Sequence, residues 1–254
     1  MADLVIRTVS AFAGIGGFER GFELAGGFEC IAQIEWKKDR LGVLAERFPS
    51  IPQFGDITEV SGADILSAAG RPDLIVGGFP CQDTSIAAPH REGLAGSRSG
   101  HFWEFARLVD EVAELVDYLD PRWCVIENPP GLLTSHRGQD MERVLHTLVE
   151  LGYGGAFRVL DSASVPGSGG QRRQRVLVLG HRGGDPRPAA QVLALGGGRG
   201  EGAGVDHTAR ASRRGPEVAR SAADHGDRLI FRKSRRARSS TDYSTYVSAD
   251  VLHT

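Results

Sequence analysis

Short apolar runs alternate with longer amphipathic segments over roughly the first 180 residues of the chain. Continuous apolar runs bounded by glycine or polar residues are typical of buried strands, and apolar residues spaced three or four apart indicate helices. This pattern predicts strands at 4–12, 28–36, 73–78, 123–128, 153–165 and 175–181. It predicts helices at 19–26, 37–48, 102–119 and 141–152.

Alternating strands and helices are typical of an α/β fold in which helices cover both faces of a mostly parallel sheet. Ligands of such sheets bind at the carboxyl ends of the strands. We therefore expect the functional residues of this chain to lie just after its strands.

The pattern changes after about residue 181. Residues 196–204 include six glycines in nine positions, which cannot bury a core. We predict an ordered domain over 1–181, a flexible linker over 182–226 and, over 227–254, the start of a further region with one short strand at 228–233.

The composition of the 254 residues, 41% hydrophobic and 24% charged, is typical of a globular protein. Residues 1–180 carry 17 basic against 24 acidic side chains, whereas 181–254 carry 13 against 8. The basic tail indicates either a polyanionic partner or a solvated segment. Three separated cysteines form neither a disulfide framework nor a zinc motif, which favours a reducing cytoplasm. We find no membrane-spanning run, no signal peptide and no metal motif.

A glycine-rich turn, Phe12-Ala13-Gly14-Ile15-Gly16-Gly17, joins the first strand to the first helix. Glycines there let the backbone approach a cofactor closely, and no Walker lysine follows. Glu35 ends the second strand, where a carboxylate can bind ribose hydroxyls, although a plain surface carboxylate fits too. Asp56 lies in a loop suited to an adenine amino group or to a simple turn. Alone, this turn also fits a dinucleotide-dependent oxidoreductase.

Cys81 follows a strand within Gly77-Gly78-Phe79-Pro80-Cys81-Gln82. A cysteine after proline in a glycine-rich loop is placed as a nucleophile, provided that the site favours its thiolate. Cys30 and Cys124 lie within apolar strands and are expected to be core residues.

Two further polar segments follow strands or precede them. Glu127-Asn128 ends the strand at 123–128, where burial can raise the pKa of a carboxyl group and fit it to act as an acid. Gln171, Arg173 and Arg175 alternate ahead of an apolar run and therefore share one face of a strand. Such arginines can bind phosphate or a base carbonyl, or simply face solvent.

The ordered set FAGIGG, IEW, GDI, GGFPCQ, ENP and QRRQR resembles the cytosine-5 DNA methyltransferase family of bacterial and phage type. The resemblance covers residues 6 to 181. It implies a Rossmann-like fold that binds S-adenosylmethionine and methylates carbon 5 of a cytosine in double-stranded DNA. It also implies a restriction-modification setting in the cytoplasm of a bacterial or phage-infected cell.

The resemblance implies a role for each matching residue. The S-adenosylmethionine pocket would be formed by Phe12, Gly14, Ile15, Gly16, Gly17, Glu35, Trp36, Asp56, Ile57 and Pro80. Catalysis would fall to Cys81, Glu127, Arg173 and Arg175. DNA contacts would come from Gln82, Ser85, Arg98, Asn128 and Gln171, with 82–100 as a loop that closes over a flipped base.

The chain departs from the family at three points. Glu127-Asn128 is followed by two prolines, and His101 replaces a usual apolar residue. The family's later motifs are missing, so we expect a C-terminally truncated enzyme. A non-catalytic remnant, a split-gene fragment that needs a missing C-terminal part, and an RNA cytosine-5 methyltransferase remain as alternatives. A missing C-terminal chain and a cognate restriction nuclease are the expected protein partners.

Overall fold

The fold was obtained as a computed structural model that describes residues 5–80, 100–116, 121–164 and 172–195, together with the backbone of 229–231. The chain divides into two compact units, which are treated separately below. The first unit comprises 1–82 and 94–127, and the second comprises 83–93 and 128–254.

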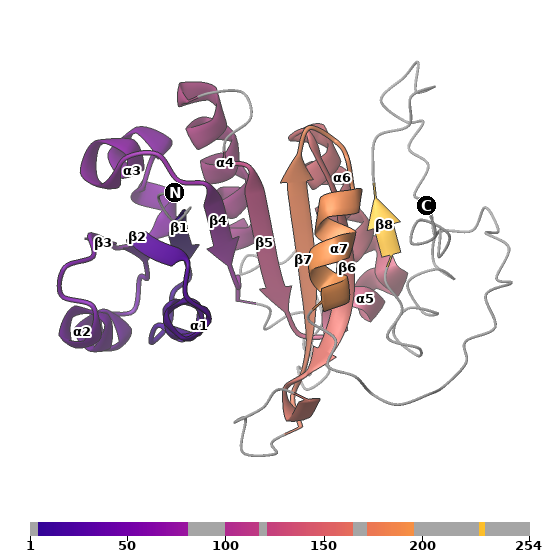
Figure 1. Cartoon of the computed structure of the whole chain (residues 1–254), viewed down its shortest axis with the longest axis horizontal. Helices are drawn as coiled ribbons and strands as arrows, with labels where there is room; N and C mark the ends of the chain where they lie inside the picture. The colour runs from indigo at the N-terminus through magenta and orange to yellow at the C-terminus, as the bar shows by residue number, and fades with distance from the viewer. Residues whose placement is uncertain (1–4, 81–99, 117–120, 165–171, 196–228, 232–254) are drawn as a thin grey trace, which may run out of the picture. The chain divides into compact units, whose positions relative to one another are not determined.

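Five parallel strands form the sheet of the first unit in the order β3-β2-β1-β4-β5 (Figure 1). The strands are β1 (Ile6–Ala11), β2 (Phe28–Ile34), β3 (Gln53–Phe54), β4 (Leu74–Gly77) and β5 (Trp123–Asn128). The helices are α1 (Gly17–Ala25), α2 (Lys38–Arg47), α3 (Gly62–Ala69) and α4 (Gly100–Leu115), with a short 3₁₀ turn η1 (Ile57–Glu59). The parallel α/β architecture predicted from the pattern is confirmed.

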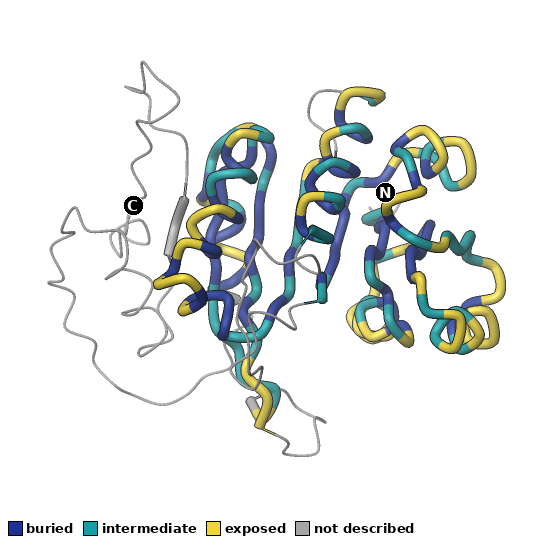
Figure 2. The backbone as a smooth tube through the Cα atoms, turned by 180° about the vertical axis from the view of Figure 1, so that it is seen from behind, coloured by how far each residue is buried: buried dark blue, intermediate teal, exposed yellow. Residues whose placement is uncertain are grey.

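The core of this unit lies along its strands, which Figure 2 shows as mostly buried segments between helices with exposed outer sides. All four residues of β4 are buried, and Ile75 and Val76 have no exposed surface. Burial on both faces explains why β4 is a continuous apolar run rather than an alternating one.

Helix α3 and strand β3 were not among the predicted elements. Helix α3 begins with a capping box, in which the Asp64 amide donates to Ser61 Oγ and the Ser61 amide donates to the Asp64 carboxylate. The Ser61 hydroxyl also donates to Asp64 Oδ2 over 2.6 Å, and this hydrogen bond and the one from the Ser61 amide lower the pKa of Asp64. Gly62 lets α3 approach α4, because a Cβ there would lie 2.8 Å from the Val112 amide nitrogen.

Antiparallel strands form the sheet of the second unit, with β6 (Tyr153–Asp161) between β7 (Gln174–Arg182) and β8 (Leu229–Phe231). Its helices are α5 (Gly131–Thr134), α6 (Gln139–Glu150) and α7 (Arg187–Leu195), and two 3₁₀ turns are η3 (Ser135–Gly138) and η4 (Ser162–Ser164). The fold is therefore a mostly parallel, mixed α/β fold, and β8 agrees with the strand predicted at 228–233.

Helix α7 corrects the linker predicted over 182–226. Ala189 and Leu193 are buried, and Leu193 accepts a hydrogen bond of 2.9 Å from the Arg158 guanidinium of β6. Residues 187–195 of the predicted linker therefore form a packed helix. Most of the remaining linker and of the region 227–254 lies outside the described residues, so those two assignments stay predictions. None of the helices that the structure describes has the length and apolar character needed to cross a membrane.

Candidate active site

The carboxyl ends of the five parallel strands meet in one row across the sheet of the first unit. Phe54 pairs with Ile34, Ile34 with Ala11, Ala11 with Gly77, and Gly77 with Ile126. The residues that directly follow these five positions in the sequence are, in the same order, Gly55, Glu35, Phe12, Gly78 and Glu127. The register therefore places the predicted cofactor residues and the predicted catalytic acid along one edge of one sheet.

The glycine-rich turn after β1 adopts left-handed backbone conformations. Phe12 has a φ of 57°, which is strained for a residue with a side chain, and Gly14 and Gly16 have φ values of 62° and 87°. Gly16 is also a point of close approach, because a Cβ at this position would overlap the Phe48 ring. Strain at a non-glycine residue is commonly retained at functional sites.

Glu35 is almost entirely buried, at 2% exposure, and its carboxylate is held in place on both oxygens. Oε2 accepts a hydrogen bond of 2.9 Å from the Gly14 amide, and Oε1 accepts one of 3.0 Å from the Lys37 amide. Arg40 Nη1 lies 3.6 Å from Oε2. A carboxylate has about four acceptor positions, so two hydroxyl groups can still donate to it.

Asp56 lies at the start of η1 and binds its own turn with only one oxygen. Its Oδ1 accepts hydrogen bonds from the Thr58 amide (3.0 Å) and the Thr58 hydroxyl (2.9 Å). Within the described part of the chain, Oδ2 has no hydrogen-bond donor. Asp56 is half-buried, whereas Ile57 beside it is 3% exposed. The pair therefore offers one fixed carboxylate oxygen beside an apolar side chain.

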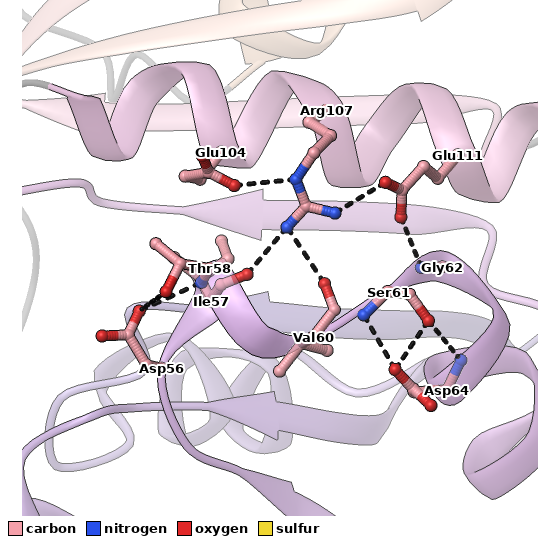
Figure 3. A network of polar contacts seen from close by, with 10 residues as sticks. All are labelled: Asp56, Ile57, Thr58, Val60, Ser61, Gly62, Asp64, Glu104, Arg107 and Glu111. Atoms are coloured by element: carbon pink, nitrogen blue, oxygen red, sulfur yellow. Dashed lines mark hydrogen bonds and ion pairs between the residues drawn. The ribbon is translucent and has the colours of Figure 1, made fainter.

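A charged network on α4 contacts the backbone of the same turn (Figure 3). Arg107 donates from one nitrogen to the carbonyls of Ile57 and Val60, and its other two nitrogens donate to Glu104 and Glu111. Partial burial opposes ionisation of Glu111, but its hydrogen bonds from Arg107 and Gly62 prevail and lower its pKa. Sequence patterns did not predict this network.

Aromatic and apolar side chains flank the edge. The His101 ring meets the Phe12 ring edge-on, with centroids 5.8 Å apart. Trp36 is 53% exposed, with Lys37 Nζ 5.5 Å from its ring centre, and Ile15 is 56% exposed. Large apolar groups so exposed next to buried polar ones are typical of a ligand site.

Glu127 lies beside the segment that leads to Cys81. A Cβ placed on Gly78 would be 2.8 Å from Glu127 Oε2, so the backbone at Gly78 passes close to this carboxylate. Glu127 and Pro80 are both half-buried. Cys81 itself lies outside the described residues, directly after Pro80.

The other two cysteines have the character expected of structural residues. Cys124 is fully buried in β5. Burial and the nearby Glu19 carboxylate raise the pKa of the Cys30 thiol to about 12. A thiol with such a pKa is almost never a thiolate at neutral pH, so neither cysteine is suited to nucleophilic attack.

Three of the described site residues belong to the second unit. Asn128 is buried at the end of β5. Arg173 is exposed and its amide donates to Asp161 Oδ1 over 3.1 Å, whereas Arg175 is half-buried at the start of β7. Gln171 lies outside the described residues, as do Gln82, Ser85 and Arg98.

The parallel sheet with its glycine turn and strand-end carboxylates defines a Rossmann-like α/β fold. The sequence matches the family model for C-5 cytosine-specific DNA methylase over residues 6–194. The chain belongs to this family of cytosine-5 DNA methylases.

Similar proteins agree with this membership. The chain is 36% identical to the type II methyltransferase M2.BsuMI of Bacillus subtilis (strain 168) over 72% of its length. It is 33% identical to the type II methyltransferase M.Sau3AI of Staphylococcus aureus over 70% of its length. The chain spans 43% of the length of each of these two relatives.

A solved structure supports the fold. The chain resembles an E. coli protein described as a DNA modification methyltransferase encoded within a prophage, with a TM-score of 0.55 and 22% identity. The match covers 70% of this chain and 47% of that one.

Proposed function

We propose that this chain carries the catalytic region of an enzyme that methylates carbon 5 of cytosine in double-stranded DNA, with S-adenosylmethionine as methyl donor. The observation that carries the proposal is the row of strand ends, which sets a glycine turn, two ordered carboxylates and the Pro80 segment along one edge. Family membership supports the same reaction, since the relatives are type II methyltransferases.

The residues of this edge fit S-adenosylmethionine. Glu35 would accept hydrogen bonds from the ribose hydroxyls, because its buried carboxylate is already oriented by two backbone amides. Asp56 would accept the adenine amino group on the oxygen that Thr58 does not use. Phe12, Ile57 and the exposed Trp36 would pack against the apolar faces of the adenine ring. The wall of the cofactor pocket would be completed by Gly14, Ile15, Gly16, Gly17 and Pro80.

The bound cofactor supplies an electrophilic methyl group, and the chain has to make carbon 5 of cytosine nucleophilic. The Cys81 thiolate would add to carbon 6 of the base, which places electron density on carbon 5. Glu127 would hold a proton at N3 and so make that addition easier. After carbon 5 has taken the methyl group, loss of its proton and elimination of Cys81 release 5-methylcytosine.

Two arguments support Cys81 as the nucleophile. Pro80, next to Cys81 in the chain, lies two residues after Gly78, whose backbone passes close to the Glu127 carboxylate. The remaining cysteines are excluded by chemistry, since Cys124 is inaccessible and Cys30 has a raised pKa. A thiol two residues beyond Phe79 is within reach of the carboxyl edge of the sheet.

Access to carbon 5 requires the cytosine to leave the base stack, at a cost of a few kcal/mol. Arg173, Arg175 and Gln171 would brace the flipped base and its phosphates, and Asn128 would hold the loop beside the base. Gln82, Ser85 and Arg98 would contact DNA from the segment 82–100. These contacts would position the duplex, and sequence recognition would require base-edge contacts from elsewhere in the protein.

The proposal is tested by incubating the full chain with S-adenosylmethionine carrying a radioactive methyl group and with duplex DNA of mixed sequence. We expect label in the DNA, and digestion to nucleosides should place it in 5-methylcytosine. A parallel reaction with transfer RNA separates the RNA alternative. Label in RNA alone would contradict the proposed substrate, and the absence of both cofactor binding and transfer would contradict the proposed function.

A further inference from the structure

Arg107 uses its whole guanidinium group in contacts that fix one short turn. Nη2 donates to the Ile57 carbonyl (2.8 Å) and the Val60 carbonyl (3.0 Å). Nε and Nη1 each lie 2.7 Å from a carboxylate oxygen, of Glu104 and Glu111 respectively. Figure 3 shows the guanidinium between the helix that carries it and the turn that it contacts. The two glutamates, one turn to either side, orient the group toward the carbonyls.

A second contact ties the far end of the same segment to α4. Glu111 Oε2 accepts a hydrogen bond of 2.8 Å from the Gly62 amide. Gly62 packs so closely that a Cβ there would lie 2.9 Å from the backbone of Glu111. Helix α4 therefore holds the segment from Ile57 to Gly62 at both ends, across 47 to 50 residues of sequence.

The held segment follows directly on Asp56. The Ile57 carbonyl belongs to the residue after Asp56, and the Asp56 carboxylate is itself bonded to Thr58 within the same turn. Any shift of the turn away from α4 would therefore move Asp56 Oδ2, and the buried Ile57 side chain would move with it. The same helix reaches the other side of the edge, where His101 contacts Phe12.

We propose that Arg107 is a positioning residue for adenine recognition, because it holds the turn that presents Asp56 and Ile57 to the base. The inference rests on the proposed function, since it assumes that this edge binds the adenosine part of S-adenosylmethionine. Arg107 does not itself contact the ligand. It acts through the backbone carbonyls of Ile57 and Val60.

The chain provides a matched control in Arg7. Its guanidinium also donates to two backbone carbonyls of the first unit, those of Ala69 (2.7 Å) and Arg71 (3.0 Å), at the opposite end of α3. Arg7→Met thus removes an arginine-to-carbonyl contact of the same kind away from the strand carboxyl ends. Both variants should lose stability, and only Arg107→Met should change adenine recognition.

The experiment is calorimetric titration of the full-length wild type, Arg107→Met and Arg7→Met with S-adenosylhomocysteine and with its hypoxanthine analogue, which lacks the adenine amino group. We expect the wild type to prefer the adenine form. Arg107→Met should bind it about tenfold more weakly and lose most of the preference, since a misplaced acceptor forfeits one charged hydrogen bond. Arg7→Met should keep both affinity and preference.

A further variant, Arg107→Lys, separates charge from geometry. Lysine keeps the positive charge near both glutamates, but its single ammonium cannot reach four acceptors in the planar arrangement that arginine uses. We expect Arg107→Lys to resemble Arg107→Met in its preference. Recovery of the wild-type preference by lysine would contradict the positioning role of the guanidinium.

The two proposals fail in different ways. A wild type that binds neither ligand would overturn the proposed function and this inference with it. A wild type that prefers adenine, with Arg107→Met keeping the same preference, would overturn only the role of Arg107. Equal loss of affinity and equal preference in the Arg107 and Arg7 variants would likewise reduce Arg107 to a contributor to stability.

Discussion

The two ends of the parallel sheet use similar chemistry for different purposes. At the amino end, Arg7 binds the carbonyls of Ala69 and Arg71, and the Asp73 carboxylate accepts from the Arg7 amide. At the carboxyl end, Arg107 also binds carbonyls. The Glu35 and Asp56 carboxylates at this end, however, keep acceptor capacity. Phe12, which is strained by its positive φ, lies at this end as well.

This difference separates residues that hold the fold from residues that could bind a ligand. Polar groups at the amino end bond to one another, so substitutions there should cost stability alone. Polar groups at the carboxyl end are oriented by the protein yet retain lone pairs, and exposed apolar groups such as Trp36 lie beside them. Substitutions there should cost ligand binding or chemistry more than stability.

The largest effect short of removing the nucleophile is expected at Glu127. Glu127→Gln keeps the size of the side chain but removes the proton that the proposed mechanism holds at N3. We expect methyl transfer to fall by about 10²- to 10⁴-fold, with little change in melting temperature, because general acid catalysis contributes about that much. Single-turnover methylation measures the rate, and an unchanged rate would rule out the acid role.

An intermediate effect is expected at Glu35. Glu35→Gln should weaken S-adenosylmethionine binding by about 10- to 100-fold, since hydrogen bonds to a charged acceptor contribute about 1.5–3 kcal/mol. Glu29→Gln, on the same strand β2 but 62% exposed and near its amino end, is the matched control and should bind normally. Equilibrium dialysis compares the two, and equal affinities would contradict the ribose role of Glu35.

The smallest effect is expected at Arg7. Arg7→Met should lower the free energy of unfolding by about 1–2 kcal/mol, because it leaves two carbonyls without a charged donor in a partly exposed setting. Cofactor affinity should stay within twofold or so of the wild type by the same reasoning that separates distant sites. Thermal unfolding measures the loss of stability, and equilibrium dialysis measures the cofactor affinity. A loss of affinity would contradict the distinction between the two ends of the sheet.

Most of the first unit could be predicted from sequence because its longer strands are largely apolar and alternate with amphipathic helices. The runs around Ile75 and Ile126 are continuous and apolar, and those around Val9 and Ile34 are apolar apart from buried polar residues such as Thr8 and Gln33. The alternation of these strands with helices indicates a parallel sheet. The predicted cofactor residues also fell at strand ends, where the register now places them. The roles of these residues remain proposals, and Cys81 lies outside the described segments.

Other features could not be predicted, for identifiable reasons. Helix α3 is short and rich in small residues, and only Ser61 and Asp64, its capping box, signalled it. Helix α7 follows glycines and contains Pro188, which suggested a linker, although proline is tolerated in the first turn of a helix. The Arg107 contacts join residues about 50 positions apart, and no local pattern records such a pairing.

The most direct test is covalent trapping on duplex DNA that contains 5-fluorocytosine, with S-adenosylmethionine present. Fluorine at carbon 5 prevents the final elimination, so an active nucleophile stays bonded to carbon 6 of the base. We predict a denaturation-resistant protein–DNA adduct with the wild type and with Cys30→Ser, and none with Cys81→Ser. An adduct that persists in Cys81→Ser, or a wild type that binds cofactor and DNA yet forms no adduct, would contradict Cys81 as the nucleophile of this chain.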